Sequence, residues 1–251
     1  MQYISEYATI TAAQAAFTPA EWDKISVNGR LLVYLDGAHF EYPGRSDGAA
    51  GMWVPYQYRD ARTVIVYAGD IDPAAAPNTS WGWTIVGGVT LAAGETQMLN
   101  PGAANANIQH TTLGLNTADH LIYMNCKVTA ASGTNGVRLQ FDGGDSLGGG
   151  RIYSLYLSYL GTAGDIRWAY DTNGVYAAGV AYVKLVFELH QAEACANIWL
   201  YDSQQMIGTC RTADFPGAAG NERIYVGCYG GAVTGTMYLD SFPAFAILEK
   251  P

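Results

Sequence analysis

Alternation of apolar and polar residues along short segments is the feature that most constrains this chain. The clearest case lies in residues 181–190, where every second residue is apolar, namely Val183, Leu185, Phe187 and Leu189. A period of two is that of a β-strand with one face turned to a core. The segment is therefore predicted to be a strand in a sheet that buries one side.

The same pattern recurs along most of the chain, with no helical pattern between the segments. Further strands are predicted at residues 121–130, 137–142, 152–160, 197–201, 206–211, 223–229 and 237–248. The connecting loops are rich in Gly, Asn, Asp and Ser, and the 30 Gly and 18 Tyr among 251 residues suit strands joined by tight turns. The predicted fold is mainly β, an antiparallel jelly-roll sandwich.

The first part of the chain is predicted to form a small α+β module. Thr18-Pro19 has the form of a helix N-cap and first helical residue, so a helix is expected from there to about Ile25. Residues 30–42 predict two strands around an Asp36-Gly37 turn, which is a strong hairpin signal. Strand segments at 53–54 and 63–67 complete this expected module.

The predicted domain division follows from a change in composition. Residues 70–77 contain prolines and small residues without periodicity, which is typical of a linker. We therefore expect an attachment or assembly module at 1–69, a linker at 70–77 and the jelly-roll sandwich at 78–251.

Charge excludes some classes of partner. With 13 basic and 22 acidic residues the net charge is −9, which argues against nucleic-acid binding and against adsorption to anionic membranes. No apolar run has the length of a membrane span, and the N-terminal residues do not resemble a signal peptide. The four cysteines allow either two disulfides or free thiols, and the absence of a signal favours buried free thiols: Cys126, Cys195, Cys210 and Cys228.

Two short motifs resemble nucleophile signatures but lack their structural setting. Residues 143–147 contain the letters of the GDSL esterase motif, yet no helix is predicted after Ser146 and no Asp-x-x-His follows it. Residues 44–48 match Gly-x-Ser-x-Gly in a predicted loop of the small module. The paired carboxylates typical of glycosidases on one strand are missing from the sequence. We therefore expect no enzyme activity.

Metal binding has weak support from the sequence. The four histidines do not fall at metal-ligand spacings, so no metal site is predicted from them. Calcium is possible through oxygen ligands in Gly-rich loops, although turns that cap their own backbone explain the same residues: Asp142, Asp145, Asp171 and Asn173. No cofactor is expected.

The second half of the chain resembles laminin-G-like and concanavalin-A-like jelly rolls. The resemblance rests on residues 182–190, 196–208, 224–227 and 235–242, although Ser203 stands where a turn glycine is common in those families. It implies a lectin-like sandwich. More weakly, Asn28-Gly29-Arg30 and residues 51–55 resemble small adaptor modules of phage tail and virion proteins.

Aromatic residues are more numerous than two inner sheet faces require. Tyr and Trp can stack on sugar rings while their polar edges form hydrogen bonds. Residues 168–174 combine such rings with amide and carboxylate groups, although for any one aromatic core or interface packing is the favoured explanation. The predicted glycan-contact residues are Trp168, Tyr170, Asp171, Asn173 and Tyr229.

Together these features give a functional hypothesis. The chain is expected to be a non-enzymatic phage virion protein, either a tail fibre or a capsid-attached appendage, located in the virion. Its expected partners are other virion proteins and a host surface glycan, and it is expected to form a homo-oligomer, with a trimer favoured. The alternatives are a stand-alone carbohydrate-binding lectin and a polysaccharide depolymerase.

Overall fold

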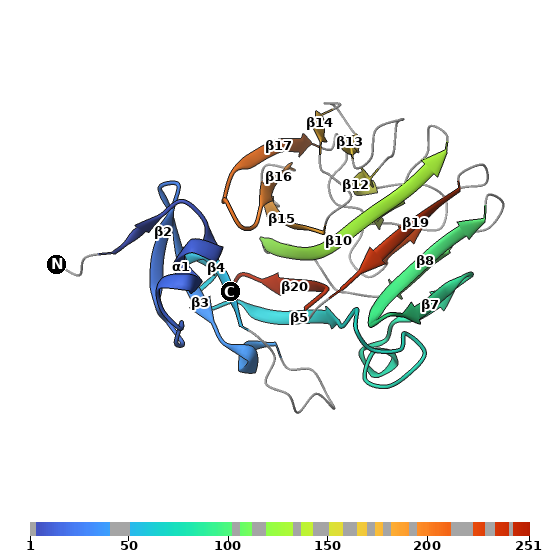
Figure 1. Ribbon diagram of the computed structural model, residues 1–251, viewed down its shortest axis with the longest axis horizontal. Helices are drawn as coiled ribbons and strands as arrows, with labels where there is room; N and C mark the ends of the chain where they lie inside the picture. The colour runs from blue at the N-terminus through green and yellow to red at the C-terminus, as the bar shows by residue number, and fades with distance from the viewer. Residues whose placement is uncertain are drawn as a thin grey trace.

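A computed structural model gives the fold of this protein (Figure 1). It describes residues 4–40, 51–101, 106–111, 119–132, 137–142, 151–157, 165–169, 174–177, 182–190, 195–211, 223–228, 234–240 and 243–251. Within these residues two large sheets face one another, and every pairing described in both sheets is antiparallel. The predicted jelly-roll sandwich is confirmed.

The first of these sheets has nine strands in the described part of the chain. Seven follow the order β17-β16-β15-β10-β19-β8-β7, while β20 pairs with β10 and β5. The long strand β10 pairs with β15 on one side and with both β20 and β19, end to end, on the other. Their bounds are β5 (Arg62–Tyr67), β7 (Val89–Ala92), β8 (Glu95–Pro101), β10 (His120–Ser132), β15 (Val183–His190), β16 (Cys195–Leu200), β17 (Met206–Arg211), β19 (Thr234–Leu239) and β20 (Phe245–Glu249).

The second sheet has seven strands, in the order β14-β13-β12-β11-β18-β9-β6. Their bounds are β6 (Thr84–Val86), β9 (Ala106–Thr111), β11 (Val137–Asp142), β12 (Arg151–Leu157), β13 (Asp165–Ala169), β14 (Gly174–Ala177) and β18 (Arg223–Cys228). A short 3-10 turn, η3 (Thr79–Trp81), precedes β6.

The sandwich core is built from the alternating residues that the sequence indicated. Leu185, Phe187 and Leu189 of β15 are buried in it, and Val183 packs against them. Ile122 and Met124 of β10 belong to the same cluster. Removal of these side chains from water supplies the main driving force for joining the two sheets.

A small four-stranded sheet and one helix form the N-terminal module. Its elements are β1 (Glu6–Tyr7), α1 (Ile10–Ala16), β2 (Lys24–Val27), β3 (Arg30–Leu35) and β4 (Met52–Pro55), with 3-10 turns η1 (Gly37–His39) and η2 (Tyr56–Tyr58). Figure 1 shows the module, in blue, beside the end of the sandwich that holds β20 and β5.

The module covers the outer face of the nine-stranded sheet at that end. Leu121, Tyr123, Val186 and Leu248 point away from the sandwich core, yet they are buried in a second cluster with the module's Trp53 and other apolar residues. This explains why β20 and β5 are apolar on both faces: Ile65, Val66, Tyr67, Phe245, Ala246 and Ile247. A strand that is buried on both faces carries apolar residues on both, so its sequence does not alternate between apolar and polar residues.

The local structure corrects two predictions in the module. The helix spans Ile10–Ala16 with Thr9 as its N-cap, whereas the predicted helix at 18–25 is a turn at 21–22 followed by β2. Asp36-Gly37 does not join two strands but leads into η1, and β3 pairs instead with β2 and β4. The two-residue hairpin turn is Asn28-Gly29, with φ of 48° and 76°.

Strand β5 and residue Asn78 lie on either side of the expected linker at 70–77. Strand β5, expected in the module, pairs with β20 in the sandwich, and Asn78 beyond the expected linker is buried and hydrogen-bonded to the backbone of Ala68. Cys126 is a buried free thiol and Cys195 is buried as well, whereas the side chains of the other two cysteines lie outside the description. Among the described residues no helix has the length and apolar character of a membrane span.

Candidate functional site

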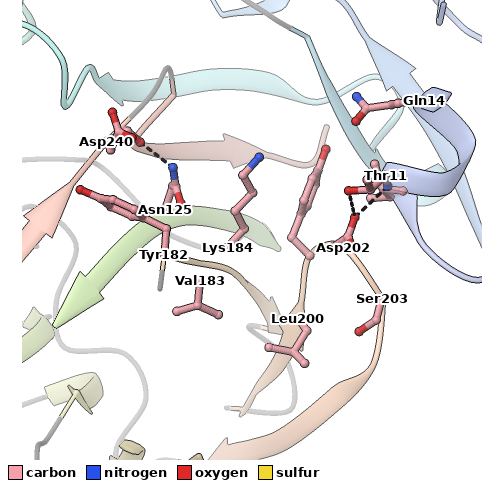
Figure 2. Close-up of a pocket in the computed structure, with 12 residues that line it drawn as sticks. Thr11, Gln14, Asn125, Tyr182, Val183, Lys184, Leu200, Asp202, Ser203 and Asp240 are labelled. Atoms are coloured by element: carbon pink, nitrogen blue, oxygen red, sulfur yellow. Dashed lines mark hydrogen bonds between the residues drawn. The ribbon is translucent and has the colours of Figure 1, made fainter. Parts of the chain in front are cut away.

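The candidate site is an open pocket of about 510 Å³ at the step where the module ends on the outer face of the nine-stranded sheet. Helix α1 forms one wall, the turn between β16 and β17 a second, and strands β10 and β15 the floor (Figure 2). Its lining is mixed, with hydroxyl, amide, carboxylate and ammonium groups beside apolar side chains.

The wall formed by α1 is fixed to the β16–β17 turn through one residue, Asp202. Asp202 Oδ1 accepts hydrogen bonds of 2.8 Å from both the backbone N–H and the hydroxyl of Thr11. The Ile10 N–H donates to the Asp202 carbonyl at 2.8 Å. These bonds satisfy donors of the first helical turn that have no partner inside a helix. The wall is thus held in place by the fold itself.

The floor is polar because two facing residues of β10 and β15 are polar. Asn125 and Lys184 are direct partners in the strand register, and both point to the outer face. The Asn125 Nδ2 donates to the Asp240 carbonyl at 2.6 Å, whereas its buried Oδ1 has no partner among the described residues. Lys184 is exposed, and Figure 2 shows it between Asn125 on one side and Asp202 on the other.

Two tyrosines flank the floor, and each has a fixed hydroxyl. Tyr201 is buried, accepts a 2.8 Å hydrogen bond from the Trp53 N–H, and has a pKa raised by that burial. Tyr182 donates to Glu95, and burial together with this bond raises its pKa as well. Both hydroxyls therefore stay protonated at neutral pH.

The Glu95 carboxylate connects Tyr182 to a basic group on the same face. Lys127 Nζ lies 3.0 Å from Glu95 Oε2, 4.6 Å from the centre of the Tyr182 ring and 4.4 Å from that of Tyr238. Although burial acts in the opposite direction, the hydrogen bonds from Tyr182 and Lys127 hold the pKa of Glu95 below its ordinary value. The cluster fixes the Tyr182 edge of the pocket.

The side chains that line the pocket offer several hydrogen-bond donors and acceptors. Lys184 and the Gln14 amide supply donors, whereas the carboxylates of Asp202 and Asp240 supply acceptors. No histidine, cysteine or buried nucleophile is among the described residues that line it. The arrangement suits a neutral ligand with many hydroxyl groups, held by convergent polar contacts.

Most of the predicted glycan-contact residues lie outside the description. Trp168 is in β13, where it pairs with Leu155 and Gly174 in the seven-stranded sheet, away from the sheet that carries the pocket. Tyr170, Asp171, Asn173 and Tyr229 are outside the described residues. Of the possible calcium ligands, Asp142 ends β11 and Asp145 is outside the description. The pocket residues were not predicted.

One group of side chains in the module could hold a metal ion. Glu21, Asp36 and His39 each offer a ligand atom, and these atoms all lie within 4.8 Å of one another. Histidine spacing did not reveal this group because its members come from two turns brought together by β3.

The fold of this chain is similar to that of several proteins of known structure. No protein-family model and no curated protein sequence matches the chain. The structure of the conserved carbohydrate esterase vb_24B_21 from the Shiga toxin-encoding bacteriophage phi24B superposes with a TM-score of 0.54 at 13% identity, covering 76% of this chain and 100% of that one.

Two further structures are similar at lower scores. Domain 4 of AbnA, an extracellular arabinanase of family GH43 from Geobacillus stearothermophilus in complex with arabinotriose, has a TM-score of 0.49 at 15% identity over 76% of this chain and 93% of that one. The carbohydrate recognition domain of Emp46p has a TM-score of 0.43 at 10% identity, and the match covers 74% of this chain and 94% of that one.

Proposed function

We propose that this chain is a non-enzymatic glycan-binding protein of a phage virion, and that the sugar binds in the pocket between α1 and the sandwich. The observation that carries the proposal is the lining, in which Lys184, Gln14 and Asp240 bring donors and acceptors to one open space. Sugars need such convergent groups because their hydroxyls must exchange hydrogen bonds with water for bonds with protein.

The fold supports the same proposal. A two-sheet sandwich offers a rigid face on which a ligand can be held by side chains of neighbouring strands. The phage carbohydrate esterase structure shares this fold with a TM-score of 0.54, which supports a phage origin and a sugar as ligand. Binding through one shallow pocket is weak, so we expect several copies of the chain to act together on a host surface.

Glycan binding is tested with the full chain. A glycan array identifies candidate sugars, and calorimetry then compares the wild type with Lys184→Ala and Gln14→Ala. Loss of a charged hydrogen-bond donor costs about 1.5–3 kcal/mol, so Lys184→Ala is expected to weaken binding about tenfold or more. Lys250→Ala serves as the control, because Lys250 is also partly exposed but does not line the pocket.

The results separate the alternatives. Sugar binding that is unchanged in both pocket variants would place the site elsewhere, and no binding to any glycan would contradict the proposal. Release of reducing ends from a bound polysaccharide would indicate a depolymerase. The solution mass from light scattering distinguishes the proposed oligomer, for which we favour a trimer, from a monomeric stand-alone lectin.

A further inference from the structure

We infer that Glu21, Asp36 and His39 form a binding site for a divalent transition-metal ion of the zinc class. This site is independent of the pocket. The side chains of His39 and Glu21 are about a quarter exposed, at 28% and 25%, so an ion can reach them from solvent. The donor set is one imidazole nitrogen and two carboxylates, a combination that zinc and related ions accept readily.

Backbone hydrogen bonds bring the three residues together. The Trp22 N–H donates to the Tyr34 carbonyl at 3.0 Å, and the Tyr34 N–H donates to the Asp23 carbonyl at 2.9 Å. The turn that carries Glu21 is thereby held along the end of β3. Asp36 and His39 follow β3 directly and are three residues apart across the 3-10 turn η1. The placement is a property of the fold and does not depend on side-chain packing alone.

The distances suit a single ion. His39 Nε2 lies 2.6 Å from Glu21 Oε1, and all three ligand atoms lie within 4.8 Å of one another. Ligand atoms bonded to one zinc ion at about 2.1 Å are roughly 3–4 Å apart. The His39–Glu21 pair must therefore open slightly to admit an ion between its two atoms.

The groups around the ligands hold them in the orientation that binding requires. Glu21 Oε2 accepts a 2.6 Å hydrogen bond from the Asp36 N–H, which leaves Oε1 directed at His39. The Trp22 ring meets the His39 ring edge-on, with centroids 5.5 Å apart. The Thr63 hydroxyl donates to the His39 carbonyl. Such supporting contacts fix metal ligands in place and raise affinity.

The electrostatics also favour a cation of charge +2. Two carboxylates that contact the same ion attract a divalent cation more strongly than one carboxylate does. We therefore expect the ion to replace the Glu21–His39 contact with two metal bonds.

The test is calorimetry of the full chain, without a histidine tag, titrated with zinc chloride. We expect one ion per chain, with an affinity that falls at least tenfold in His39→Gln and in Glu21→Gln. His190→Gln is the matched control, because His190 contacts Asn197 in the sandwich and is not part of the group. Circular dichroism checks that each variant is folded, and Asp36→Asn replaces any variant that is not.

Cobalt chloride gives a second, spectroscopic readout at the same site. Trp22 is 47% exposed and touches His39, so bound cobalt should quench its fluorescence. The quenching should disappear in His39→Gln and in Glu21→Gln, and it should remain in His190→Gln. The inference is overturned if the wild type binds no zinc, or if His39→Gln and Glu21→Gln bind zinc as tightly as the wild type.

Discussion

Arg30 and Glu188 join the module to the sandwich through two side chains. Arg30 Nη2 lies 2.5 Å from Glu188 Oε2, and their side chains are only 14% and 4% exposed. Gln57 donates to the other Glu188 oxygen at 2.5 Å, and the Arg30 guanidinium lies 3.8 Å from the centre of the Trp199 ring. Burial lowers the pKa of Arg30, whereas the Glu188 carboxylate opposes this change.

Removing one partner of this pair should destabilise the protein strongly. Arg30→Met leaves the Glu188 carboxylate buried without its cation, which typically costs about 3–5 kcal/mol. Arg62→Met is the control, because Arg62 is 75% exposed in its pair with Glu249 and should cost less than about 1 kcal/mol. Urea unfolding measures both, and equal effects of the two variants would contradict this account.

His110 should make stability depend on pH. Its Nε2 donates to the Trp81 carbonyl at 2.7 Å, while its buried Nδ1 has no partner among the described residues. Burial lowers the pKa of His110 below its ordinary value of 6.5, although the bond to Trp81 opposes the change. The unfolded chain therefore binds a proton at a higher pH than the folded one, and stability falls as pH drops below about 6.5.

The measurement is the urea midpoint at several pH values between 7.5 and 5.5. The wild type should lose stability across this window, and His110→Gln should lose less, because Gln can still donate to Trp81 but does not titrate. A variant with the full wild-type slope would assign the pH dependence to other groups.

At the scale of elements, the turn between β16 and β17 holds helix α1 in place. Thr9 caps the helix by accepting the Ala12 N–H at 3.0 Å, but a seven-residue helix is marginal without tertiary contacts. Those contacts come from burial of Ile10 and Ala13 in the second cluster and from the hydrogen bonds to Asp202. Asp202→Ala should destabilise the protein by about 1–2 kcal/mol, with Asp202→Asn closer to the wild type because its Oδ1 still accepts.

Hydrogen exchange of residues 10–16 measures the release of the helix directly. Ser203→Ala is the matched control, because the Asn28 side chain donates to the Ser203 carbonyl and not to its hydroxyl. Faster exchange should appear only in Asp202→Ala. The same exchange in all three variants would show that Asp202 does not anchor α1.

The elements also show how far the sequence reveals the fold. The strands of the sandwich were predictable because each buries one face, and period-two patterning reports that directly. In the module, Asn28-Gly29 was the true hairpin turn, and its residue types already suited the positive φ angles found there. The helix predicted from Thr18-Pro19 was wrong. The Ala20 N–H donates to the Asp23 carboxylate and closes a turn there, and the cap residues alone do not indicate this contact.

The pocket could not be predicted because its residues come from distant parts of the chain. Asn125 and Lys184 meet through the pairing of β10 with β15, and Gln14 joins them only when α1 docks on the sheet. One signal was present: Val186 interrupts the polar face of β15, and an apolar residue there indicates that something covers that face. Nothing local identifies the covering element.

For the whole molecule, the shared second core means that the module and the sandwich stabilise one another. A chain that begins at Arg62 would keep β5 but expose Leu121, Tyr123, Val186 and Leu248 to water. We expect this truncated chain to melt well below the full chain and to bind a hydrophobic dye such as ANS. A truncated chain with the melting temperature of the full protein would show that the two parts are independent.

Strand β20 has a consequence for the way the chain matures during synthesis. It lies between β10 and β5, contributes residues to both cores, and follows every other strand of its sheet along the chain. A ribosome releases it after those strands, so neither core can close while the chain is still being elongated towards it. Nascent chains that stall before residue 245 should therefore depend on chaperones.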